Sequence, residues 1–130
     1  MKKPKINMGI TKEDLGYSAH ALVNNISINT QGDNFEELKA AIVEAVNLAF
    51  EDKGFVYSID EIKMTYELGS FFDFYKVINA KALSERIGMN QSLLAQYIKG
   101  IKKPSPVQTK RIIQGVHQIG KELSEISFIL

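Results

Sequence analysis

The chain has 130 residues and a mass of 14.6 kDa, with 45% hydrophobic and 24% charged side chains. This size suits one compact domain or two very small ones and excludes a disordered tail protein. With no cysteine and only two histidines, disulfides and thiolate metal sites are excluded, and we expect no metal and no cofactor. The apolar runs are too short to cross a bilayer and the first residues lack the apolar stretch of a signal peptide, so we expect a cytoplasmic protein.

Charge is unevenly distributed along the sequence. Residues 1–76 contain 8 lysines against 12 acidic residues, whereas residues 77–130 contain 6 lysines and 2 arginines against 3 glutamates. Net charges of −4 and +5 indicate two modules with different partners. The alternative is that charged residues are distributed unevenly over the surface without functional meaning. We predict one domain over residues 1–68 and a second over residues 69–130, and the basic one is a candidate for binding phosphate backbones.

Three short strands are predicted in the acidic half. Apolar and polar residues alternate over residues 6–10, 17–21 and 26–28, which is the period of a half-buried strand. Asn24 and Asn25 can adopt the positive φ of a tight hairpin turn between the second and third strands. The pattern favours an antiparallel meander.

A helix is predicted from residue 35 to residue 50, because apolar residues recur there at spacings of three and four. Asn34 can cap its first turn, and Glu37 can complete a capping box. Residues 55–64 then predict a further strand. The expected fold class is α+β, a small antiparallel sheet with one packed helix followed by an all-α domain.

The acidic half contains no catalytic constellation. No Ser-His-Asp set, Cys-His pair or glycine-rich phosphate loop accompanies its carboxylates, and His20 lies in a strand pattern. We interpret the carboxylates as helix-end and solvent-facing charges, and we expect no catalytic residue and no enzyme. The carboxylates concerned are Asp33, Glu36, Glu37, Glu44, Glu51 and Asp52.

The basic half predicts two short helices joined by a tight turn. Asn79 can cap a helix over residues 80–87, and Asn90 can cap a second one over residues 91–99. A glycine follows each helix and can supply the left-handed residue that ends it. The outline is that of a helix-turn-helix, although αα-hairpins that bind no DNA share it. The apolar residues expected to be buried where the helices cross are Leu83, Ile87, Leu94 and Ile98.

The outward face of the second helix has the composition of a DNA-reading surface. Glutamine can pair with adenine by two hydrogen bonds, and alanine permits close approach in the major groove. Residues 81–111 also contain seven basic residues against Glu85 alone. We predict base contacts from Gln91, Ser92, Ala95 and Gln96. We predict phosphate contacts from Lys81, Lys99, Lys102 and Lys103.

A longer helix is predicted after Ser105, which can cap it with Pro106 at the first helical position. Its apolar residues recur at spacings of four and three, so this seam can close the domain core or face a second copy of the chain. The apolar residues Ile126 and 128–130 also need burial. A homodimer or a higher even oligomer would provide it.

Residues 82–105, ALSERIGMNQSLLAQYIKGIKKPS, resemble the DNA-binding domains of the lambda-repressor and Cro-like (Xre) family. The shared features are a small-residue helix, a glycine turn, a Gln-Ser helix opening and a basic exit ending in Pro-Ser. The resemblance covers residues 71–123, with residues 71–78 as the first helix. It implies a helix-turn-helix domain that binds operator DNA.

The acidic half resembles the HicB antitoxin family over residues 5–68. The matching residues are Gly16-Tyr17 and, at the helix start, Gly32-Asp33-Asn34-Phe35-Glu36-Glu37. The family's Pro-Asp-Leu-Pro-Gly-Cys-like segment is replaced by VNNISINT. The resemblance implies a degraded RNase-H-like or ferredoxin-like fold that binds a toxin, and a DNA-binding domain after a HicB-like domain is a known arrangement in the family.

Together the resemblances imply an antitoxin of a type II toxin–antitoxin system. Its acidic domain would neutralise a basic, HicA-like mRNA-cleaving toxin, and its basic domain would bind operator DNA and repress its own operon. The alternative is a stand-alone helix-turn-helix transcription regulator whose N-terminal domain binds a small ligand or dimerises. A remnant nuclease is disfavoured, because the carboxylate cluster of two-metal chemistry is missing.

Overall fold

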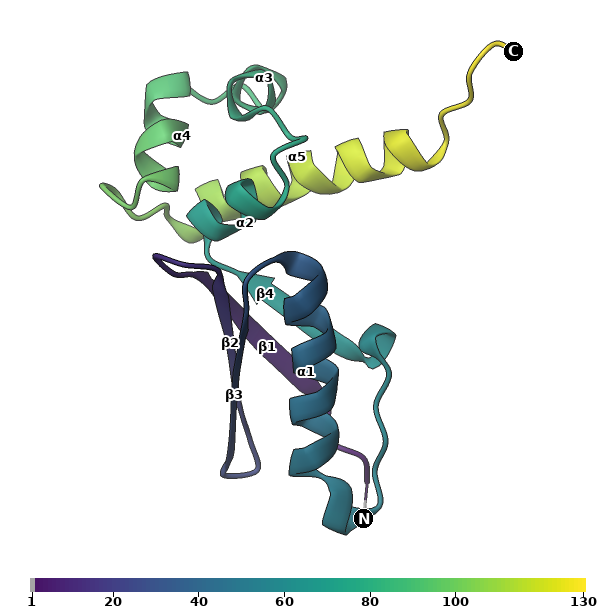
Figure 1. The fold of residues 1–130 in the computed structure, drawn as a ribbon. Coiled ribbons are helices and arrows are strands. Elements are labelled where there is room, and N and C mark those ends of the chain that lie inside the picture. Colours follow the sequence, from purple (N-terminus) through teal and green to yellow (C-terminus); the bar gives the residue numbers. More distant parts are fainter. Residues whose placement is uncertain (1) are drawn as a thin grey trace. The chain divides into compact units, whose positions relative to one another are not determined.

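A four-stranded sheet with a helix on one face forms the N-terminal part of the chain, and helices form the rest (Figure 1). The computed structural model describes residues 2–130. Contacts divide the chain into two compact units, the first ending at Phe74 and the second beginning at Tyr75. No helix within residues 2–130 is long and apolar enough to span a membrane. The fold is α+β.

The strands of the first unit are β1 (Ile6–Lys12), β2 (Tyr17–Val23), β3 (Ile26–Gly32) and β4 (Ile62–Tyr66). Their order in the sheet is β3-β2-β1-β4. β1, β2 and β3 form the predicted antiparallel meander. Asn24 and Asn25 make the turn between β2 and β3 at φ values of 49° and 67°, which confirms the predicted hairpin.

The sheet is mixed, which corrects the prediction of an antiparallel one. β4 pairs parallel with β1, so that Met8 lies opposite Met64. The connection explains the direction. Helix α1 (Phe35–Ala49) crosses one face of the sheet and returns the chain to the end at which β3 begins, so the next strand runs in the direction of β3 and β1.

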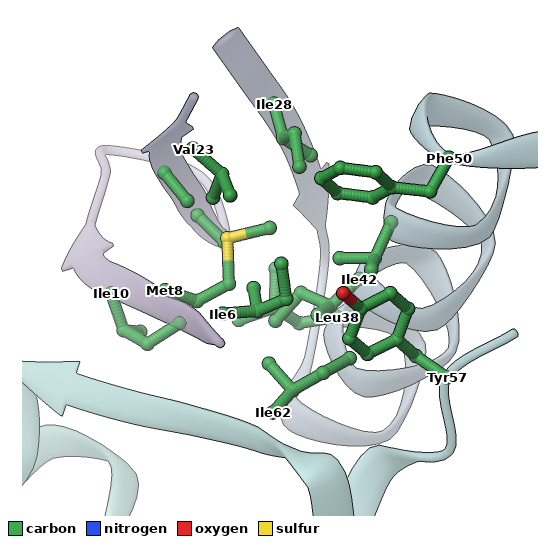
Figure 2. Packing of buried hydrophobic residues seen from close by; sticks show 13 residues of the cluster. Ile6, Met8, Ile10, Val23, Ile28, Leu38, Ile42, Phe50, Tyr57 and Ile62 are labelled. Atoms are coloured by element: carbon green, nitrogen blue, oxygen red, sulfur yellow. The ribbon is translucent and has the colours of Figure 1, made fainter. Parts of the chain in front are cut away.

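α1 begins where the sequence predicts. Asn34 Oδ1 accepts a hydrogen bond from the Glu37 N–H at 2.9 Å, as expected of the cap residue. Glu37 Oε2 accepts from the Asp33 N–H at 3.1 Å and not from the Asn34 N–H, so the predicted capping box is not completed. The apolar face of the helix packs on the inner side chains of the strands (Figure 2). The helix residues buried there are Leu38, Ile42 and Val46.

Residues 55–64 form a strand only in their last part, contrary to the prediction. A 3₁₀ turn, η2 (Ile59–Glu61), precedes β4. The cause is Tyr57, whose side chain is 3% exposed and lies in the core. Its backbone N–H and C=O bond to the Asn47 side chain of α1 at 2.7 and 3.1 Å. These bonds replace the pairing that a strand would make.

Helix α2 (Leu68–Phe74) belongs to the first unit, so the boundary falls later than the predicted one after residue 68. Ser70 Oγ accepts from the Lys12 N–H at 2.9 Å, and Phe74 stacks on Tyr17 with ring centroids 4.0 Å apart. Because these contacts close the end of the sheet, the aromatic residues of α2 serve the first unit. They are not the first helix of the second domain.

The helices of the second unit are α3 (Ala80–Arg86), α4 (Gln91–Ile98) and α5 (Pro106–Ser124). All three N-caps are the predicted residues, and each cap side chain accepts a backbone N–H of the first turn. The buried residues of this unit are Leu83, Ser84, Met89, Leu94 and Ile112. This core is smaller than that of the first unit.

Candidate nucleic-acid interface

The turn between α3 and α4 has the backbone geometry that the sequence predicts. Gly88 adopts a φ of 66°, and the Met89 N–H bonds to the Ser84 C=O at 2.9 Å, which ends α3. Asn90 Oδ1 then accepts from the Ser92 N–H at 2.8 Å and starts α4. A left-handed glycine and a capping asparagine thus turn the chain from one helix to the next within residues 87–90.

Two polar residues of α4 lie opposite its buried side. Leu94 is 1% exposed and faces the core. At 100° per residue, Ser92 and Gln96 fall on the opposite side of the helix. Gln91 and Ser92 are exposed, whereas Ala95 and Gln96 are half-buried. Of the four residues predicted to read bases, Gln91 and Ser92 in the first turn of α4 are therefore the most accessible.

A lysine-rich loop is fastened to the end of α4. Gly100 adopts a φ of 77°, and the Gln96 C=O accepts from the Ile101 N–H at 2.9 Å and from the Lys102 N–H at 3.3 Å. These bonds hold the loop beside the last turn of the helix. The lysines predicted to contact phosphates are exposed and form no ion pair within the described residues: Lys81, Lys99, Lys102 and Lys103.

Both arginines of this unit are engaged inside it. Arg86 donates to both carboxylate oxygens of Glu122 at 2.9 Å, and these hydrogen bonds raise the pKa of Arg86 and lower the pKa of Glu122. Arg111 donates to the Ile87 C=O at 2.6 Å and to the Gly88 C=O at 2.9 Å. The count of seven basic residues in the sequence therefore overstates the number of side chains free to contact phosphates, because Arg86 is paired with Glu122 and Arg111 is bound to backbone carbonyl groups.

Two residues that position the turn were not singled out from the sequence. Arg111 holds the carbonyl groups at the end of α3, as described above. Gly115 of α5 lies against Leu83 of α3 and against Ile87, the residue that caps that helix. The sequence carries one signal for Gly115, since it is spaced three residues from the buried Ile112 on the same helix face.

In the first unit, the two segments that carry the HicB resemblance lie side by side. Tyr17 pairs with Gly32, and a Cβ atom added at Gly16 would overlap the Gly32 C=O. A Cβ atom at Gly32 would come 2.6 Å from the backbone nitrogen of Leu38 in α1. The two glycines therefore let β2, β3 and α1 approach closely, which is a structural role.

One group of polar side chains fastens α2 to the sheet. The Tyr17 hydroxyl donates to one carboxylate oxygen of Asp73, and Lys12 Nζ donates to the other at 2.8 Å. The hydrogen bond to Asp73 and burial raise the pKa of Tyr17 to about 12. No group of three or more His, Asp or Glu side chains in the described residues could hold a metal ion.

The sheet face that α1 leaves open is polar. An open depression of about 480 Å³ lies over β2 and β3 and is lined in part by Ser18, His20, Asn29 and Gln31. Gly9 of β1 makes room for the imidazole, because a Cβ atom there would come 2.9 Å from His20 Cε1. This face therefore presents hydrogen-bonding side chains to solvent.

Comparison with known proteins gives no match. No family model, no curated protein and no solved structure matches the chain. Any proposal for function therefore depends on the residues and the geometry described above.

Proposed function

We propose that this protein is an antitoxin of the HicB type, which neutralises a HicA-like mRNA-cleaving toxin with its N-terminal unit and represses its own operon with its C-terminal unit. On this proposal the first unit is a HicB-like domain and the second is a helix-turn-helix domain. Neither unit is expected to be an enzyme.

The observation that carries the proposal is the pair α3 and α4. They are joined by a glycine turn, α4 presents Gln91 and Ser92 to solvent, and an exposed lysine loop follows directly. Glutamine and serine can donate to and accept from base edges, whereas lysines suit phosphates, which require charge and no particular geometry. One end of the unit thus offers both kinds of contact that operator binding needs.

The acidic charge of the first unit supports the toxin part of the proposal. The outer face of α1 presents Glu36, Glu44 and the adjoining Glu51 to solvent. An RNA-cleaving toxin needs a basic surface for its substrate, and a carboxylate-bearing partner matches such a surface in charge. The match favours rapid association as well as affinity.

The experiment that tests the toxin part begins with the coding region adjacent to this one. A short basic protein encoded there should co-purify with the full chain, and co-expression should relieve its toxicity. The fragment 1–74 should suppress the RNase activity without the second unit. If the fragment 75–130 inhibits instead, while folded 1–74 does not, the roles of the two units are reversed.

The alternative is a stand-alone helix-turn-helix regulator whose first unit binds a small ligand. The polar depression over β2 and β3 favours this alternative, because its hydrogen-bonding side chains could bind a small polar ligand. A thermal-shift screen of small polar metabolites separates the two functions. A ligand that stabilises the full chain and changes its affinity for DNA, with His20→Ala abolishing both effects, would favour the regulator.

A further inference from the structure

The two edges of the sheet differ in how they are protected. β4 has five residues and carries Lys63 on the open face, and both a short length and a lysine discourage strand addition. β3 has seven residues, no charge and no proline, and it pairs with β2 residue for residue without a bulge. The β3 edge therefore has none of the features that normally prevent another strand from pairing with it.

The hairpin register decides which backbone groups point outward from β3. Val23 and Ile26 flank a two-residue turn and so form a hydrogen-bonded pair, and such pairs alternate along an antiparallel ladder. The N–H and C=O groups of Ser27, Asn29 and Gln31 therefore point away from β2. Within residues 2–130 these groups have no hydrogen-bond partner.

The flank of α1 above this edge carries apolar side chains. Asn47 faces the opposite way, because its side chain bonds to the backbone of Tyr57 in the segment that leads into β4. Ala41, Ala45 and Leu48 recur at spacings of four and three on the other flank. Leu48 is 63% exposed there. A strand added to β3 would meet this apolar flank.

We propose that β3 pairs antiparallel with β3 of a second copy, about a two-fold axis at Asn29, which joins two four-stranded sheets into one. This pairing places Asn29 opposite Asn29 and Ser27 opposite Gln31 of the second copy, so no like charges meet. Ile26 and Ile28 of each copy would extend beneath the α1 flank of the other. The inference is independent of the antitoxin proposal.

Charge favours a second copy over the basic toxin at this edge. The edge strand contains no charged residue, whereas the carboxylates of α1, Glu36, Glu37 and Glu44, are exposed on the outer face of the helix. A cationic partner fits that outer face. An uncharged, self-complementary edge fits an isologous contact, in which the same surface is used by both copies.

The absence of cysteine makes disulfide trapping in the full chain specific to an introduced residue. Asn29→Cys should form a disulfide-linked dimer under mild oxidation, and Thr65→Cys, on the open face at the other edge, is the matched control. Paired thiols have an effective concentration in the millimolar range, whereas the concentration of free thiols is micromolar, so Asn29→Cys should react about a thousandfold faster. Equal rates of disulfide formation for Asn29→Cys and Thr65→Cys would overturn the proposal, even if the chain dimerises through another surface.

Amide exchange measured by NMR provides the second readout. Protection of the Ser27, Asn29 and Gln31 amides should increase with protein concentration. Asn29→Lys should abolish that increase because two lysines would face each other, whereas Thr65→Lys should preserve it. Protection that appears only when a different protein is added would assign the edge to that partner and contradict the pairing of two copies.

Discussion

Gly115 of α5 lies directly against Ile87, the residue that caps the end of α3, and a Cβ atom built at Gly115 would overlap the Ile87 Cγ2 atom. The same Cβ atom would come 3.1 Å from Leu83 Cδ1. Ile87 is the residue whose carbonyl Arg111 also holds. The end of α3, and with it the turn into α4, is therefore positioned by a glycine and an arginine of α5.

Gly115→Ala should destabilise the second unit by about 1–3 kcal/mol, because the added methyl group overpacks the contact with α3. Gly120→Ala is the matched control in the same helix, since a Cβ atom there meets nothing within 4 Å. That substitution should stabilise by roughly 0.5–1 kcal/mol through helix propensity. Chemical denaturation of both variants measures the difference, and equal effects would show that α3 and α5 do not pack as described.

A fragment ending at residue 74 should unfold at a higher temperature than one ending at residue 68. The shorter fragment loses the bond from the Lys12 N–H to Ser70, the Asp73 contacts and the stacking of Phe74 on Tyr17. Circular dichroism melts of the two fragments make the comparison. Identical melting temperatures would place α2 outside the first unit.

The pKa of Tyr17 predicts a late phase in alkaline titration. Its folded-state pKa of about 12 lies above the ordinary 10.0, so its contribution to stability is complete below pH 10 and is lost as the pH rises through about 12. Absorbance at the phenolate band should show a component near pH 12 that Tyr17→Phe removes. If the titration curve of the variant loses only a component near pH 10, the bond to Asp73 is not formed.

Operator DNA should contain an inverted repeat if the protein binds as a two-fold dimer. Two α4 helices would then lie about one DNA turn, roughly 34 Å, apart or a multiple of it. The exposed apolar residues of the chain end, Ile126, Phe128 and Ile129, motivate a dimer of this half. Titration by light scattering should give two chains per site, and one chain per site at micromolar concentration would contradict the dimer.

Local features of the fold could be predicted where a few neighbouring residues decide them. The caps at Asn34, Asn79, Asn90 and Ser105 and the hairpin at Asn24 and Asn25 all occur as expected. Each depends on one side chain or one φ value, which a short sequence specifies.

Features that depend on contacts between distant residues could not be predicted in the same way. Residues 55–58 have an apolar strand pattern, but the backbone N–H and C=O of Tyr57 bond to the side chain of Asn47, ten positions earlier. The sequence pattern of α2 does not reveal its partners, because Phe74 packs on Tyr17 of β2, far earlier in the chain, as well as on Tyr66 of the adjacent β4. For the candidate interface, the sequence indicated that Gln91 and Ser92 are exposed, but not that Ala95 and Gln96 are half-buried. It also did not indicate that both arginines are engaged internally.

Fluorescence anisotropy with the DNA upstream of the coding region tests the central claim most directly. The full chain, Gln91→Ala and Lys102→Ala are each titrated with that duplex and a scrambled one at several salt concentrations. Gln91→Ala should lose about 1–3 kcal/mol on the upstream duplex and much less on the scrambled one. Lys102→Ala should weaken both and reduce the salt slope by about one unit. If Gln91→Ala loses equally on both duplexes and Lys102→Ala leaves the slope unchanged, this face of the second unit does not read DNA.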